Sequence, residues 1–412
     1  MVRNNLLDTQ EKCADIISKG ILTGTPIMIH PSVNPMIGPS YYVQINMGAR
    51  YVPCMKTVHD VQDRTAAMGP LTWPCPNATS NTGADVSCSL PELCGFGNSV
   101  PLPQPGGDLN GTTPDPNNPG HYVTEYPDQW YRFIIPIFLH AGLVHIGFNL
   151  LLQLTLGRDV EKLIGSLRFA LVYFTSGIFG FVLGGNFAAD GIASTGCSGS
   201  LFGILAITLL DLLYTWSERE KPWIELLFIG LDIVVAFVLG LLPGLDNFSH
   251  IGGFLMGLVL GVCILRSPKS FSRYPMTHSL DTNHRRHSST PLTPSGLKDF
   301  LRAPLSFFQN RRGVWWAWWL VRAAALVGAL IGFILLLKNF YEWRVSCDGC
   351  KYLSCLPVTV DGTNWCEIGN LNFTNYNLTT NGTESGPQRM ARDLIGVGVE
   401  FWDRGSWGVD GV

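Results

Sequence analysis

The chain has 412 residues, of which 14% are charged, and a formal net charge of −3. Its mean hydropathy of +0.20 is high for a soluble protein, so composition argues against an ordinary globular domain and favours a membrane protein. The charge is nearly neutral and no patch combines basic and aromatic residues, so nothing supports a nucleic-acid partner and we expect none.

Residues 1–130 are predicted to form a lumenal region that contains cysteines and glycosylation sites. Residues 1–50 hold neither an apolar run long enough to span a bilayer nor the basic-then-apolar layout of a signal peptide. A region of this length needs a segment that carries it across the membrane. We therefore expect a first transmembrane helix ahead of this sequence; the alternative is that the first span present acts as a reverse anchor.

Six apolar runs approach the length of ~20 residues that crosses a hydrocarbon core. They lie at 142–163, 167–188, 197–215, 223–242, 248–265 and 314–337. The predicted fold class is an all-α polytopic membrane protein, a helical bundle with a disulfide-bearing lumenal loop and tail. After the lumenal region, the predicted divisions are a core of five spans at 131–266, a cytoplasmic linker at 267–313, an extra C-terminal span at 314–338 and a lumenal tail at 339–412.

The basic segment 266–313 sets the orientation of the spans. It carries nine Lys and Arg against two acidic residues, Asp281 and Asp299, which is typical of a cytoplasmic linker. With this linker in the cytoplasm, the other basic residues near span ends fall on the same side, as the positive-inside rule requires. These residues are Arg158, Lys162, Arg168, Arg219 and Lys221.

Cysteines and glycosylation sequons cluster in the two regions that this topology places in the lumen. The cysteines are Cys54, Cys75, Cys88 and Cys94 before the first span, and Cys347, Cys350, Cys355 and Cys366 after the last. The sequons are at Asn77, Asn110, Asn372, Asn377 and Asn381. These cysteines are expected to form disulfides, and their pairing is left open. At Cys347 and Cys350 a disulfide is favoured over a zinc knuckle. A further sequon at Asn247 lies too close to the membrane to be used.

Four polar residues are predicted to meet at one depth in the membrane. The spans that begin near 142, 197 and 248 all run in the same direction, so Ser198 and His250, each in a first helical turn, lie equally deep. Pro136 interrupts its apolar run, which predicts an embedded loop up to about His140 and a helix from about Ala141. His145 and Asn149 then share one face of that helix.

Such a cluster supplies what a hydrolytic site needs, namely a nucleophile, a base and donors for an oxyanion. Asp211 lies ~20 Å along its helix from Ser198, which is too far to orient His250, so the site would be a Ser-His dyad. The alternative is that the small residues around Ser198 and His250 serve only as seams for helix packing.

These residues resemble the rhomboid intramembrane serine proteases over about 34–266. The matching motifs are Asn34-Pro35, Gly38-Pro39-Ser40, Gly48-Ala49, Tyr131-Arg132, His140-x4-His145-x3-Asn149, Gly196-x-Ser198-Gly199 and His250-x2-Gly253-x3-Gly257. The span after the core resembles the layout of eukaryotic secretory-pathway members. Tyr131 departs from the tryptophan that the family places before the arginine.

The resemblance implies roles for individual residues. Ser198 would be the nucleophile and His250 the general base, while His145, Asn149 and the Ser198 N–H would hold the oxyanion. The site-supporting residues would be Gly196, Gly199, Phe202, Gly253, Gly257 and Arg132. Phe202 stands where relatives often stack a tyrosine on the histidine. No cofactor and no metal are implied.

The function expected from the resemblance is an intramembrane serine endopeptidase. Its partners would be the lipid bilayer and single-pass membrane proteins, which it would cleave within their transmembrane segments near the lumenal face. Its location would be a secretory-pathway membrane: Golgi, endosome or plasma membrane. The alternative is a non-catalytic rhomboid-like protein that binds membrane clients for trafficking or degradation. Members of that kind typically lose the serine or the histidine, whereas this chain keeps both.

Overall fold

The structure is a computed structural model. It describes residues 36–58, 61, 72–78, 86–95, 112–114, 122–124, 127–241, 246–265, 313–345, 347, 349–350, 353, 359–360 and 363–364. The linker expected at 267–313 lies outside these residues except for Gly313. The division of the chain into five regions therefore stays a prediction.

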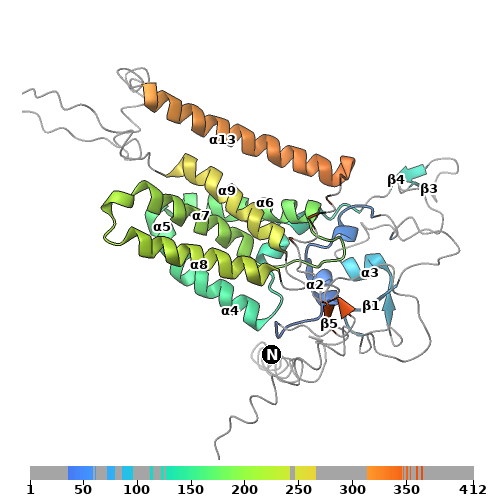
Figure 1. The fold of residues 1–412 in the computed structure, drawn as a ribbon. Coiled ribbons are helices and arrows are strands. Elements are labelled where there is room, and N and C mark those ends of the chain that lie inside the picture. Colours follow the sequence, from blue (N-terminus) through green and yellow to red (C-terminus); the bar gives the residue numbers. More distant parts are fainter. Residues whose placement is uncertain are drawn as a thin grey trace, which may run out of the picture.

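The described helices form one bundle, as the composition predicts (Figure 1). They are α4 (Leu143–Leu152), the π-helical turn η4 (Gln153–Gly157), α5 (Arg158–Ile164), α6 (Ser166–Phe187), α7 (Ser198–Tyr214), the 3₁₀ turn η5 (Trp216–Glu218), α8 (Pro222–Gly240), α9 (Asn247–Ile264) and α13 (Gly313–Lys338). Each of the six predicted apolar runs coincides with helical residues, and α4, η4 and α5 follow one another within the first run. By length and hydropathy, α6, α9 and α13 with its continuation are each able to cross a membrane.

The segment before α4 is compact without being α-helical. It forms two 3₁₀ turns, η2 (Trp130–Phe133) and η3 (Ile135–Phe138), with Pro136 near the start of the second. Proline has no N–H to donate and clashes with a preceding helical turn, so no α-helix runs through Pro136. The backbone is extended at Leu139 and again at Gly142, and α4 begins at Leu143. The break in the helix that Pro136 predicts is present, and α4 starts two residues later than expected. That this loop lies within the membrane stays a prediction.

Glycines bring α6, α7 and α9 into close contact at the centre of the bundle. A Cβ atom on Gly253 of α9 would overlap the carbonyl oxygen of Gly199 on α7, and one on Gly257 would overlap that of Gly203 one turn further along. On α6, a Cβ on Gly180 would overlap the carbonyl oxygen of Ser249 of α9. Small residues let helix backbones approach where lipid offers no hydrophobic drive. The packing seam predicted from the glycine spacing is present.

Short elements from the predicted lumenal region gather at the end of the bundle where α7 and α9 begin (Figure 1). We call this the disulfide-bearing end. The elements are α2 (Tyr41–Met47), the 3₁₀ turn η1 (Val52–Cys54), α3 (Leu90–Cys94) and two antiparallel pairs, β1 (Trp73–Pro74) with β2 (Ser87–Cys88) and β3 (Thr112–Pro114) with β4 (Tyr122–Thr124). Disulfides join Cys54 to Cys94 and Cys75 to Cys88.

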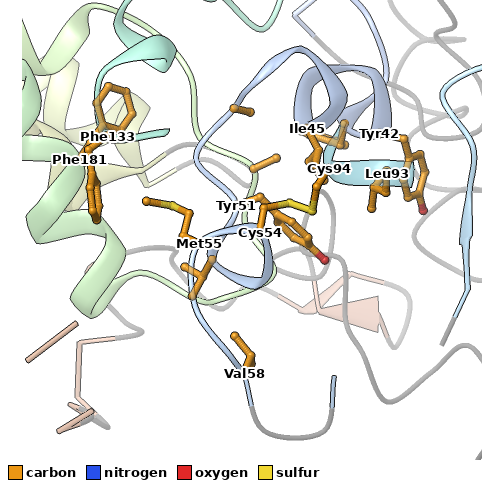
Figure 2. Close-up of a cluster of buried hydrophobic side chains, with 14 of the residues drawn as sticks. Tyr42, Ile45, Tyr51, Cys54, Met55, Val58, Leu93, Cys94, Phe133 and Phe181 are labelled. Atoms are coloured by element: carbon orange, nitrogen blue, oxygen red, sulfur yellow. A yellow bond between two sulfur atoms is a disulfide. The ribbon is translucent and has the colours of Figure 1, made fainter. Parts of the chain in front are cut away.

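One hydrophobic cluster joins these short elements to the helices. Figure 2 shows Ile45, Met55 and Leu93 in the same cluster as Phe133 of η2 and Phe181 of α6, with the Cys54–Cys94 bond among them. These side chains are buried, at 5% exposure or less. The cluster therefore ties the disulfide-bearing end rigidly to the membrane bundle.

Arg132 anchors the same region through its guanidinium group. The side chain is fully buried and donates to Gln129 Oε1 at 2.6 Å, to the carbonyls of Ile45 and Ala49 at 2.8 and 2.6 Å, and to the carbonyl of Cys94. These carbonyls lie at the ends of α2 and α3, where helical partners run out. Arg132 holds the short helices in place, and its support of the site stays a prediction.

The C-terminal helix α13 packs along α9 and α6 and is held at both ends. At one end Arg322 Nη2 donates to the carbonyl of Leu265, the residue that follows α9, at 2.6 Å. At the other end the π-helical turn η6 (Asn339–Trp343) binds Asn186 of α6 through Asn339 at 2.8 Å. A last pair, β5 (Thr359–Val360) with β6 (Thr363–Asn364), follows. The extra span is therefore an integral part of the bundle.

Substitution of Gly257 by alanine is expected to destabilise the fold, because its new Cβ would press on the backbone of Gly203. Overpacking of this kind costs about 1–3 kcal/mol. Thermal unfolding in detergent should show a clear fall in Tm. Gly328→Ala is the matched control, since a Cβ on this α13 glycine would meet nothing within 4 Å; an equal fall in both variants would contradict the account.

Candidate active site

Ser198 is the first residue of α7 and follows a sharply turned loop. Gly196 adopts a φ of 117°, which side chains rarely allow, and its N–H donates to the carbonyl of Pro136 at 2.9 Å. A Cβ at Gly196 would lie 2.6 Å from Cε1 of His145. This glycine is required both for the turn and for the approach of the His145 ring to the loop before Ser198.

Ser198 and His250 are in direct contact. The distance from His250 Nε2 to Ser198 Oγ is 2.8 Å, within hydrogen-bonding range. The ring of Phe202, one turn after Ser198, stacks on the His250 ring with centroids 4.6 Å apart and planes 11° apart. This geometry agrees with the prediction that parallel helices bring Ser198 and His250 together. Phe202 stacks on the histidine without needing a hydroxyl.

No carboxylate completes a triad among the described residues. His250 Nδ1 has no hydrogen-bond partner in this part of the chain. Asp211 instead pairs with Arg219 at 2.7 Å, near the opposite end of α7. The arrangement is therefore that of a Ser-His dyad, with the imidazole held by stacking and by the position of α9.

His145 is held in one tautomer by its neighbour. The Ala141 N–H donates to His145 Nδ1 at 3.2 Å, so Nδ1 is the acceptor and Nε2 carries the proton. Nε2 can then donate toward the loop that precedes Ser198, as an oxyanion donor must. Asn149 is buried, and its Nδ2 donates to the carbonyl of His145 at 2.9 Å. A role for Asn149 at the oxyanion stays a prediction.

The structure describes some of the predicted thiol and glycosylation sites. Cys347 and Cys350 form a disulfide, not a metal site. Within the described residues, no group of three or more His, Cys, Asp or Glu could hold a metal ion. Asn77 is exposed, whereas Asn247 is fully buried and donates to the carbonyl of Leu353 at 3.0 Å. The sequons at Asn110, Asn372, Asn377 and Asn381 lie outside the described residues.

Two charged residues near the dyad lie outside the sequence motifs of the site. Arg50 and Asp246 form a buried ion pair at 3.0 Å, at the first turn of the helix that carries His250. A charged residue beside an apolar span requires a partner, but the sequence does not indicate which residue that partner is. Neither residue lies within the quoted motifs, although Arg50 directly follows Gly48-Ala49.

Comparison with known proteins identifies the family. A rhomboid domain model matches residues 127–267. Rhomboid-type serine protease 2 of Emericella nidulans is 53% identical over 372 residues, which cover 87% of this chain and 69% of that protein. The chain belongs to the rhomboid family. The resemblance inferred from the motifs is confirmed, and so is the fold class, an integral membrane bundle of rhomboid type.

The relatives of this rhomboid include proteins named as inactive. Inactive rhomboid protein 1 of Rattus norvegicus is 32% identical over 235 residues, covering 57% of this chain and 23% of that protein. The Homo sapiens protein of the same name matches with the same values. Family membership therefore supports an intramembrane protease but does not by itself establish catalysis by this chain.

Glycan mapping tests which sequons of this rhomboid are used. We expect Asn77 to carry a glycan because its side chain is exposed, and Asn247 to carry none because it is buried in the fold. Enzymatic deglycosylation in heavy-oxygen water followed by peptide mass spectrometry marks each modified asparagine. Asn77→Gln should remove one glycan. An isotope label at Asn247 would contradict its burial in the fold, and the absence of a label at Asn77 would contradict a lumenal location of this exposed asparagine.

Proposed function

We propose that this rhomboid is an intramembrane serine endopeptidase that uses Ser198 as nucleophile and His250 as general base. The observation that carries the proposal is the 2.8 Å contact between Ser198 Oγ and His250 Nε2. A nucleophile within hydrogen-bonding distance of a base that is itself held in place is the signature of covalent catalysis. Stacking on Phe202 holds the base.

The reaction then proceeds in two halves. His250 Nε2 accepts the Ser198 proton as Oγ attacks the scissile carbonyl carbon, and the carbonyl oxygen becomes an oxyanion. The Ser198 N–H, His145 Nε2–H and Asn149 would stabilise that charge. The imidazolium returns its proton to the leaving amine, which departs and leaves an acyl-enzyme. Water, deprotonated by His250, attacks the ester and regenerates the Ser198 hydroxyl.

The position of the site in the bundle favours a membrane-embedded substrate. Ser198 and His250 both lie in first helical turns at the disulfide-bearing end, and both are half-buried. Disulfides at this end support a lumenal orientation. The substrates we propose are single-pass membrane proteins, cleaved within their transmembrane segments near the lumenal face, in a secretory-pathway membrane such as Golgi, endosome or plasma membrane.

A non-catalytic role in binding membrane clients is the second candidate. Its support is the similarity to proteins named inactive rhomboid protein 1. Against it stands the retention of both dyad residues with their side chains in contact. A binder has no need for this contact, so we favour the protease.

Co-expression with tagged single-pass membrane proteins tests the choice. The chain should release a substrate fragment that Ser198→Ala does not release. Ser200→Ala is the matched control, because Ser200 is on the same helix but its hydroxyl lies against Gly177 of α6. Ser200→Ala should retain cleavage. Equal cleavage by the wild type and Ser198→Ala, or rescue of a deletion phenotype by Ser198→Ala, would favour the binder.

The stacked ring of Phe202 offers a finer test. Phe202→Ala should lower the cleavage rate about 2- to 10-fold, because aromatic stacking contributes about 0.5–1.5 kcal/mol. Phe202→Tyr keeps the ring and should stay near the wild-type rate. The measurement is the initial rate of substrate cleavage by protein purified in detergent. A wild-type rate in Phe202→Ala would show that stacking does not hold His250.

A further inference from the structure

Arg50 occupies a fixed position at the end of α2. Gly48 ends this helix with a φ of 111°, and its N–H donates to the carbonyls of Gln44 and Ile45. The carbonyl of Ala49 accepts from Arg132 at 2.6 Å. The backbone just before Arg50 is therefore held by the end of α2 and by Arg132. Arg50 itself is fully buried.

The backbone of Arg50 pairs with the segment that leads to the nucleophile. Its N–H donates to the carbonyl of Ser194 at 2.9 Å, and the Ser194 N–H donates back to the Arg50 carbonyl at 3.0 Å. Ser194 stands four residues before Ser198 in the sequence. This two-bond bridge fixes the start of the loop that turns at Gly196 and delivers Ser198 to α7.

The side chain of Arg50 binds the cap of the helix that carries the base. Arg50 Nη2 donates to Asp246 Oδ2 at 3.0 Å, with both side chains at 2% exposure or less. Asp246 in turn caps α9, accepting from the Ser249 N–H at 3.2 Å and from the Ser249 hydroxyl at 2.5 Å. Asp246 stands four residues before His250.

Asp246 is the counter-charge that Arg50 contacts, although a second acidic group is near. Asp190 lies in the loop after α6, where burial raises the pKa of its carboxyl while the charges of Lys56 and Arg50 oppose the shift. The described hydrogen bond of the Arg50 side chain runs to Asp246.

We infer that Arg50 is a positioning residue that sets the distance between Ser198 and His250, its backbone holding the serine loop and its side chain holding the histidine helix. This inference rests on the proposed protease function and adds to it a residue outside the dyad and the oxyanion donors. Removal of the guanidinium leaves Asp246 buried without its partner, so the first turn of α9 loses its anchor.

The test is the kinetics of Arg50→Gln in the purified full chain, with a tagged single-pass membrane protein that the wild type cleaves. Small displacements of reacting groups cost up to about 100-fold in rate, so kcat should fall about 10- to 100-fold. KM should stay near the wild-type value, since Arg50 is buried and does not bind the substrate. Thermal unfolding and gel filtration establish that the variant is folded.

Two further variants separate positioning from general destabilisation. Arg50→Lys keeps the charge but not the planar guanidinium, so it should recover part of kcat. Arg50→Gln/Asp246→Asn replaces the ion pair by a neutral pair that can hydrogen-bond, and its kcat should exceed that of Arg50→Gln. If Arg50→Gln does not fold, the near-isosteric Asp246→Asn answers the same question, because it removes the charge and keeps the Oδ1 acceptor.

Arg322→Gln is the matched control, because Arg322 holds the opposite end of the same helix through Leu265. It should lower Tm and leave kcat unchanged. If the wild type cleaves and a folded Arg50→Gln or Asp246→Asn keeps wild-type kcat, or if Arg322→Gln loses as much kcat, the positioning role is wrong while the protease stands. If the wild type itself cleaves no substrate, the proposed function fails and the positioning role fails with it.

Discussion

The close approach of α7 and α9 is the constraint on which the site depends. Gly253 and Gly257 of α9 lie against the backbone of Gly199 and Gly203 on α7, with no room for a side chain between them. Only at this separation can residues in the first turns of two helices share a hydrogen bond of 2.8 Å. The glycine seam therefore serves packing and catalysis together, because it brings Ser198 close to His250.

The region outside the bundle completes this geometry. Arg132 holds the end of α2, α2 leads into Arg50, and Arg50 reaches both the serine loop and the cap of the histidine helix. The Cys54–Cys94 disulfide and the cluster in Figure 2 keep that region in place against the helices. At the opposite face, α13 binds α9 and α6 at its two ends. The disulfide-bearing end holds the first turn of α9 beside the dyad, and α13 holds the other end of α9.

The sequence predicted the parts of this fold that depend on local pattern. Long apolar runs predicted the helices, Pro136 predicted the embedded loop, and the common direction of two spans predicted that Ser198 and His250 meet. The Arg50–Asp246 pair joins residues 196 positions apart and has no local signature, so only the folded chain reveals it. The same holds for the disulfide pairing, because many pairings of the cysteines satisfy the same topology. The position of α13 against α6 and α9 depends on individual polar contacts, which a hydropathy pattern does not predict.

Catalysis by the dyad requires that His250 activates Ser198. The most direct measurement is the site of reaction with a fluorophosphonate, mapped by peptide mass spectrometry on the purified chain and on His250→Asn. We expect one adduct on Ser198 of the wild-type chain and its loss in a folded His250→Asn variant, because the hydroxyl needs the base to become nucleophilic. Absence of an adduct in the folded wild-type chain, or an adduct on Ser198 that forms equally fast without His250, would contradict it.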